Sequence, residues 1–247
     1  MPNNVITFDS TLAAVSEALP IDPQPYTLGN RPTGLIIVDE VNGFCTVGHG
    51  ALAPTEPNEQ IATMVSESNR LANTFTERGW PVLAFLDTHE PNKPEPPYPP
   101  HCEKGSGEEN LVPELLWLEV NPHATLIRKD CINGFIGSID LETGHNALLD
   151  WVNQHELEAL VVVGICTDIC VMDFVLTLLS VRNHGMTKAL KDVVVYAKGC
   201  STFHLPAKTV HQLGLPKTAT HPQDIAHHVG LYMMTERGAL IASSITL

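Results

Sequence analysis

Basic residues are scarce in this chain. The sequence holds 14 Lys and Arg against 28 Asp and Glu, so its formal net charge is −14 over 247 residues. A surface of this sign repels both the phosphate backbone of nucleic acids and anionic membrane surfaces. We therefore expect neither a nucleic acid nor a membrane as a partner.

Long hydrophobic runs are also missing. No apolar stretch approaches the roughly 18 residues of a membrane span, and residues 1–20 lack the basic start and apolar core of a signal peptide. The six cysteines are scattered along the chain, which is typical of free thiols in a reducing compartment and not of a disulfide framework. These absences predict a cytoplasmic protein that also reaches the nucleus by diffusion.

What the chain does contain is enough apolar material for one large domain, since 43% of its residues are hydrophobic. Several short runs rich in β-branched residues lack the polar alternation of half-exposed strands, as buried parallel strands do. The runs are Gly34 to Val38, Val82 to Leu86, Ala124 to Ile127, Leu160 to Gly164, Asp192 to Tyr196 and a last one at Leu240 to Ile245.

Helical patterns separate these runs. Asn58 is expected to cap a helix that Gly79 ends, a second helix is expected from Thr167 to Gly185, and a third from about Pro222 to Arg237. Strands that alternate with helices predict an α/β fold with a doubly wound, mainly parallel sheet and helices on both faces. In such a fold the ligand site lies beyond the carboxyl ends of the strands.

Reactive side chains are concentrated just after the predicted strands. Asp39 follows the first, Asp87 and His89 follow the second, Lys129 follows the third, and the turn holding Cys166 and Cys170 follows the fourth. An acid, a base, a thiol and a pair of possible metal ligands are therefore expected in one crevice. We expect the helix N-terminus and Lys129 to lower the pKa of a thiol in this turn.

Each of these residues also has a structural interpretation. Glu40 competes with Asp39, because neighbours on an extended chain point to opposite faces. Lys129 could be part of a solvated strand end, and Cys170 could be a small buried hydrophobe. The residues alone do not choose between Cys166 and Cys170 as the nucleophile.

A metal site is a further possibility at the second strand end. Asp87 and His89 lie on the same side of an extended segment, as ligands of a divalent metal do. His101 and Glu95 lie in or just beyond the proline-rich loop from Pro91 to Pro100 and could complete the set. The His227-His228 pair on the C-terminal helix is interpreted as structural.

Four blocks of sequence resemble the isochorismatase-like cysteine hydrolases, and within them the nicotinamidases of plant type. The resemblance covers the chain from about residue 33 to its end, which predicts a single hydrolase domain over 33–247 and an extension of unassigned role over 1–32. The blocks are Val38-Asp39 through Phe44, Asp87-Thr88-His89 through Cys102, Arg128-Lys129-Asp130, and Gly164 through Val171.

The resemblance implies a catalytic triad of Asp39, Lys129 and Cys170, with the second cysteine of the turn as the nucleophile. It also implies a cis peptide between Ile165 and Cys166 and an oxyanion hole made by the backbone amides of Cys166 and Cys170. The thiolate would attack the substrate, and Asp39 would move the proton.

The resemblance also implies the ligand set and the pocket walls. The metal ligands would be Asp87, His89 and His101, with Glu95 at a position that varies in the family. One divalent metal ion is expected, with zinc the first expectation and manganese or iron as alternatives. The walls of the substrate pocket would be Phe44 and Tyr98.

The activity implied is hydrolysis of nicotinamide to nicotinate and ammonia through a cysteine thioester, a step of NAD salvage. The alternatives are a hydrolase of the same fold acting on another small amide or a carbamoyl compound, and a catalytically silent binding protein. Relatives are commonly oligomeric, so we expect a homo-oligomer.

Overall fold

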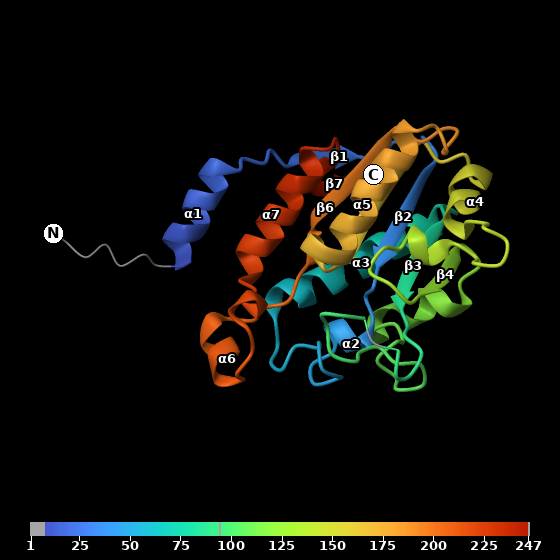
Figure 1. Ribbon diagram of the computed structural model, residues 1–247. Coiled ribbons are helices and arrows are strands. Elements are labelled where there is room, and N and C mark those ends of the chain that lie inside the picture. The colour runs from blue at the N-terminus through green and yellow to red at the C-terminus, as the bar shows by residue number, and fades with distance from the viewer. Residues whose placement is uncertain (1–7, 94, 247) are drawn as a thin grey trace.

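The computed structural model describes residues 8–93 and 95–246, and within them seven strands form one parallel sheet (Figure 1). The strand order is β1-β7-β6-β5-β2-β3-β4. The strands are β1 (Gln24–Thr27), β2 (Thr33–Val38), β3 (Val82–Asp87), β4 (Ala124–Lys129), β5 (Ala159–Ile165), β6 (Asp192–Ser201) and β7 (Leu240–Thr246).

Helices cover both faces of the sheet. On one face α3 packs with a 3₁₀ helix at Pro113–Val120, and on the other α4, α5 and α7 pack against β2, β3, β5 and β6. The helices are α1 (Phe8–Ala18), α2 (Asn42–Cys45), α3 (Glu59–Glu77), α4 (Ala147–Gln154), α5 (Met172–Asn183), α6 (Ala207–Gln212) and α7 (Gln223–Thr235). The predicted doubly wound fold is confirmed.

Most expected element boundaries are close to the observed ones, but β6 extends five residues beyond its expected end at Tyr196, to Ser201. Asn58 caps α3 by accepting a hydrogen bond of 3.0 Å from the amide of Ile61, and Gly79 follows the helix with a φ of 69°. The sequence patterns did not predict α1, α2, α4, α6 or β1. β1 pairs with β7 and forms one edge of the sheet, and α1 lies beside α7 (Figure 1).

The topology fixes the position of the site. From β2 the chain adds β3 and β4 on one side and later β5, β6 and β7 on the other, so the winding reverses between β2 and β5. A crevice forms at the carboxyl ends of strands at such a reversal. Asp39 follows β2 and Cys166 follows β5, so both lie at this point.

Gly164 allows these two strand ends to approach each other. Its φ is 121°, and a Cβ atom there would lie 2.1 Å from the carbonyl oxygen of Val38. No other residue type fits that conformation and that space. None of the described helices combines the length and hydropathy that a membrane span requires.

Candidate active site

Lys129 is the centre of a buried charge cluster. Its Nζ lies 2.8 Å from Oδ2 of Asp39 and 2.9 Å from Oδ1 of Asp87, and it donates a third bond of 3.0 Å to the carbonyl of Cys131. The Lys129 and Asp39 side chains are 0% exposed. Although burial lowers the pKa of Lys129, the nearby Asp39, Cys170 and Asp87 raise it more, so the ammonium remains charged. The interpretation of Lys129 as a solvated strand end is wrong.

Asp39 faces this ammonium with an unusual backbone. Its φ is 54°, in the left-handed region that non-glycine residues rarely adopt, and such strain is concentrated at functional sites. Burial raises the pKa of Asp39 to about 7, although the charge of Lys129 and the neighbouring Cys170 thiol act in the opposite direction. A carboxylate with this pKa is a much stronger base than an exposed one.

Glu40, the competitor of Asp39, lies on the other side of the strand end. Its side chain is buried and accepts a hydrogen bond from the hydroxyl of Ser68 on α3. Burial raises the pKa of Glu40 to about 8, so this carboxyl is largely protonated at neutral pH. The alternation of neighbouring side chains along the strand therefore separates the two acids as expected.

We expect Glu40→Gln to stabilise the protein at pH 8 by about 2 to 5 kcal/mol and to have little effect at pH 4. The unfolded chain loses the Glu40 proton near pH 4.5 and the folded chain only near pH 8. Wild-type stability therefore falls across that window, and the glutamine variant avoids the fall. Chemical denaturation at several pH values measures the difference. The exposed Glu119→Gln is the control, and a gain that does not depend on pH would contradict the assignment.

The nucleophile turn begins directly after β5. The peptide between Ile165 and Cys166 is cis, as expected, and Thr167–Val171 forms a π-helical turn that continues into α5. The two sulfurs have different surroundings. Cys170 is buried beside Lys129 and Asp39, whereas the thiol of Cys166 has Thr202 and Phe203 as hydrogen-bond partners. Only the Cys170 sulfur therefore has both a base and a cation beside it.

The expectation of a lowered thiol pKa is wrong for the free protein. Burial raises the pKa of Cys170 well above its usual value, and the charge of Lys129 offsets this only in part. Burial likewise raises the pKa of Cys166 to about 12. Cys170 is therefore a neutral thiol at rest, and its proton must be removed as it attacks.

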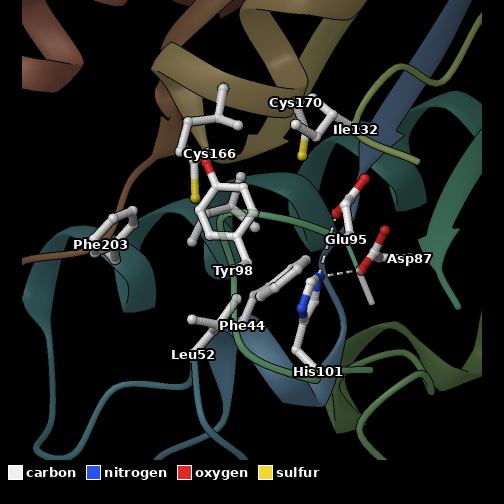
Figure 2. A pocket seen from close by; sticks show the side chains of 12 residues that line it. Phe44, Leu52, Asp87, Glu95, Tyr98, His101, Ile132, Cys166, Cys170 and Phe203 are labelled. Atoms are coloured by element: carbon white, nitrogen blue, oxygen red, sulfur yellow. Dashed lines mark ion pairs between the residues drawn. The ribbon is translucent and has the colours of Figure 1, made fainter. Parts of the chain in front are cut away.

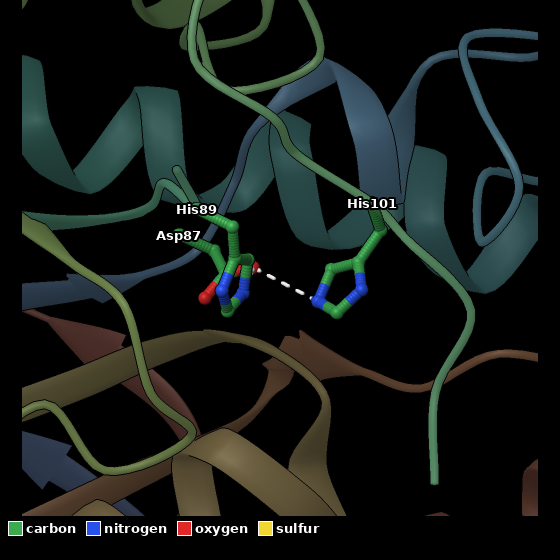
Figure 3. A group of neighbouring side chains, drawn as sticks. All are labelled: Asp87, His89 and His101. Carbon is green, nitrogen blue, oxygen red and sulfur yellow. Dashed lines mark hydrogen bonds and ion pairs between the residues drawn. The ribbon is translucent and has the colours of Figure 1, made fainter. Parts of the chain in front are cut away.

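Asp87, His89 and His101 form a buried cluster whose candidate ligand atoms all lie within 4.8 Å of one another (Figure 3). Nε2 of His89 lies 3.0 Å and Nε2 of His101 lies 3.1 Å from Oδ2 of Asp87. Glu95 approaches from the proline-rich loop, with Oε2 3.6 Å from both imidazole nitrogens. The structure therefore brings all four expected ligands together.

The donor atoms of this cluster fit a divalent metal. Nδ1 of His101 lies 2.8 Å from the carbonyl of Pro99, which only accepts, so Nδ1 carries a proton and Nε2, 3.1 Å from Asp87, is the atom that would bind a metal after losing any proton it shares with that carboxylate. Burial raises the pKa of Asp87, but Lys129, His101 and His89 lower it more, so its carboxylate stays charged. Carboxylate and imidazole ligands suit zinc, manganese and iron.

One pocket joins these groups. It lies at the carboxyl ends of the strands and is partly open to solvent (Figure 2). Phe44, Tyr98 and Cys170 contribute to its lining, as expected, together with the candidate metal ligands Asp87, Glu95 and His101. The structure adds residues that sequence reasoning missed, namely Leu52, Ile132, Ile165, Ile169 and Phe203.

Comparison with known proteins gives the family. Residues 33–221 match the isochorismatase domain. This chain belongs to the isochorismatase family. Nicotinamidase 1 of Arabidopsis thaliana is 51% identical to it over 248 positions, which cover 100% of this chain and 99% of that relative.

Solved structures of similar proteins have the same fold as this chain. The nicotinamidase of Bacillus subtilis superposes with a TM-score of 0.62 at 20% identity, covering 86% of this chain and 99% of that one. The pyrazinamidase of Pyrococcus horikoshii in complex with zinc gives 0.59 at 18% identity, covering 85% and 98%. At such identities these structures establish the shared fold.

The histidine pair on α7 lies outside the pocket lining of this isochorismatase domain. Nδ1 of His227 lies 2.8 Å from the hydroxyl of Thr167, and Nε2 of His228 lies 2.8 Å from the carbonyl of Leu19. Burial lowers the pKa of His227 to about 4, so this imidazole is neutral. Both contacts tie α7 to neighbouring segments.

Proposed function

We propose that this protein is a nicotinamidase, which hydrolyses nicotinamide to nicotinate and ammonia through a thioester on Cys170. One observation carries the proposal: the Cys170 thiol lines the same pocket as the candidate metal ligands Asp87, Glu95 and His101, and the buried Asp39–Lys129 pair contacts both Cys170 and Asp87. The identity of 51% with a nicotinamidase over the whole chain supports it. As part of the proposal, the protein acts in the cytoplasm as a homo-oligomer.

Asp87, His89 and His101 would hold one divalent metal, zinc first among the candidates, with Glu95 as an additional ligand. A metal bound there supplies a Lewis-acid site for the pyridine nitrogen of the substrate. The Pyrococcus pyrazinamidase contains zinc, which supports this choice. Phe44 and Tyr98 provide aromatic surfaces against which a flat ring can pack.

The reaction follows from the positions of the three catalytic residues. Asp39 takes the thiol proton as the Cys170 sulfur attacks the carboxamide carbon, and then gives that proton to the departing nitrogen. Ammonia leaves and a thioester remains. Water, deprotonated by Asp39, attacks the thioester and releases nicotinate, and the proton returns to the sulfur. The amides of Cys166 and Cys170 are proposed to stabilise the oxyanion.

Lys129 keeps Asp39 able to accept a proton at each step of the reaction. Its charge limits the rise in the pKa of Asp39 that burial causes, and it also favours the thiolate of Cys170. Without this ammonium, a carboxyl buried so completely would retain its proton at neutral pH. The lysine is therefore proposed to set the proton affinity of both reacting groups.

We expect kcat/KM for nicotinamide to rise about tenfold per pH unit below pH 7 and to level above it. Asp39 must be deprotonated to accept the thiol proton, and burial raises its pKa to about 7. Ammonia release between pH 5 and 9 measures the profile, with the metal content determined at each pH to exclude metal loss. A rising limb centred near pH 4 would contradict the role of Asp39.

The proposed function is tested by ammonia release from nicotinamide and from a panel of unrelated small amides and carbamoyl compounds. We expect strong preference for nicotinamide, loss of activity on treatment with a chelator, and recovery when zinc is returned. A carbamoyl hydrolase would prefer another substrate and need not lose activity on chelation. Binding of nicotinamide without turnover by metal-loaded protein would indicate a silent binding protein.

A further inference from the structure

The substrate pocket has an apolar end that the proposed reaction does not use. Figure 2 shows Phe203 at the opposite side of the pocket from Asp87, Glu95 and His101, with Cys166 between them. Side chains that are well separated in one view are separated in space. The pocket therefore extends past the cysteine turn, away from the metal ligands.

Phe203 is held in place by a clamped loop. The segment from Thr202 to Pro222 leaves the sheet after β6, carries α6, and returns to the start of α7. At its base, Leu205 and His221 exchange backbone hydrogen bonds of 2.9 and 2.8 Å. The residues at the base are therefore fixed although α6 projects from the molecule (Figure 1).

His221 supports the Phe203 ring directly. The two rings stack with centroids 3.8 Å apart and planes 14° apart. Nδ1 of His221 lies 2.8 Å from the carbonyl of Phe203, and Nε2 lies 2.8 Å from Oδ2 of Asp168. A carbonyl and a carboxylate both accept, so each nitrogen donates and His221 is an imidazolium. Its charge on the face of Phe203 adds a cation–π attraction.

Asp168 links this support to the nucleophile turn. It precedes Cys170 by two residues, and its Oδ1 accepts a hydrogen bond of 2.7 Å from the hydroxyl of Thr202. The carboxylate thus holds both ends of the segment that carries Phe203. The position of the Phe203 ring is thereby tied to the position of the attacking sulfur.

We propose that Phe203, supported by His221 and Asp168, is a specificity wall that closes an apolar subsite for a small alkyl group on the substrate ring. The proposal rests on the proposed nicotinamidase function. With the ring nitrogen at the metal ligands and the carboxamide at Cys170, the ring carbon adjacent to neither is carbon 5. The substrate class is therefore the pyridine-3-carboxamides with a methyl or ethyl group at that carbon.

The lining of the subsite decides the kind of substituent. Leu52 and Phe203 offer no polar group to a substituent, so a charged or hydrogen-bonding group packed against them would lose its hydration without compensation. An alkyl group would gain from leaving water. His221 is a positioning residue in this scheme, because it acts through Phe203.

The experiment compares kcat/KM for 5-ethylnicotinamide with kcat/KM for nicotinamide in the zinc-loaded full-length protein. The ratio does not depend on the fraction of folded enzyme. We expect Phe203→Ala to raise the ratio about tenfold and Phe203→Trp to lower it about tenfold, as for one or two carbons in an apolar pocket. His221→Ala should raise it by a smaller factor, through KM and not kcat.

His211→Ala is the matched control, since it removes an exposed histidine from the same loop and should leave the ratio unchanged. 6-Methylnicotinamide, substituted beside the ring nitrogen, should stay a poor substrate for every variant. A ratio that is the same in wild type, Phe203→Ala and Phe203→Trp would overturn the specificity wall while leaving the nicotinamidase proposal intact. Failure of the wild type to hydrolyse nicotinamide would instead defeat the proposed function and this inference with it.

Discussion

Cys170→Ala is expected to reduce ammonia release from nicotinamide by about 10⁴-fold or more. Loss of a nucleophile that works with a base removes the whole covalent route, and the effect approaches that of removing every catalytic group together. Cys170 is the sulfur that lies beside both Asp39 and Lys129. Single-turnover assays on the purified variant would show whether any acyl-enzyme forms.

Cys166→Ala is the informative comparison. Its sulfur has Thr202 and Phe203 as partners, and the backbone amide proposed for the oxyanion hole survives the substitution. We expect ammonia release to fall by less than about tenfold, as it does when a pocket wall is altered and not when a nucleophile is lost. Loss of activity in Cys166→Ala together with retained activity in Cys170→Ala would contradict this assignment and identify Cys166 as the nucleophile.

The strand ends could be predicted because a buried parallel strand has a simple signature. Six of the seven strands contain an apolar run, and Asp39, Asp87 and Lys129 lie just beyond the ends of three of those runs. β1 could not be found in this way, because a four-residue edge strand with a proline carries almost no pattern. Its pairing with β7 is decided by the tertiary structure.

Phe203 was missed for a related reason. The apolar run of β6 stops at Tyr196, so the expected strand ended there, and residues beyond Ser201 were not considered as part of the crevice. In the structure Lys198 and Gly199 continue the strand, because β5 pairs with β6 across an irregularity and aligns Gly164 with Cys200. That register depends on β5 and is not visible in the β6 sequence.

The pKa of Cys170 shows another limit of sequence reasoning. A helix N-terminus and a nearby lysine both favour a thiolate, and both are visible in the sequence. The opposing effect is burial, which depends on tertiary packing, since Cys170 belongs to the core cluster on the α5 side of the sheet. Burial is the larger effect for this thiol, and only the folded structure reveals it.

Lys129→Met is expected to destabilise the metal-free protein by about 3 to 5 kcal/mol and to reduce activity by about 10³-fold or more. Lys129 is the ammonium between Asp39 and Asp87, and removing it leaves two buried carboxylates facing each other without a cation. The charge also holds the pKa of Asp39 near 7, so its loss would leave the base protonated at neutral pH. Urea denaturation and ammonia release measure the two effects.

Lys93→Met is the control, because Lys93 pairs with Asp130 at the surface and such exposed pairs contribute little to stability. Lys129→Arg should fail to restore activity, since a planar guanidinium cannot replace a compact ammonium that donates in three directions. Added zinc should recover part of the stability of Lys129→Met, because a metal on Asp87 compensates the charge of that buried carboxylate, but none of the activity. Equal and small destabilisation in Lys129→Met and Lys93→Met would show that Lys129 is not the cation on which both carboxylates depend.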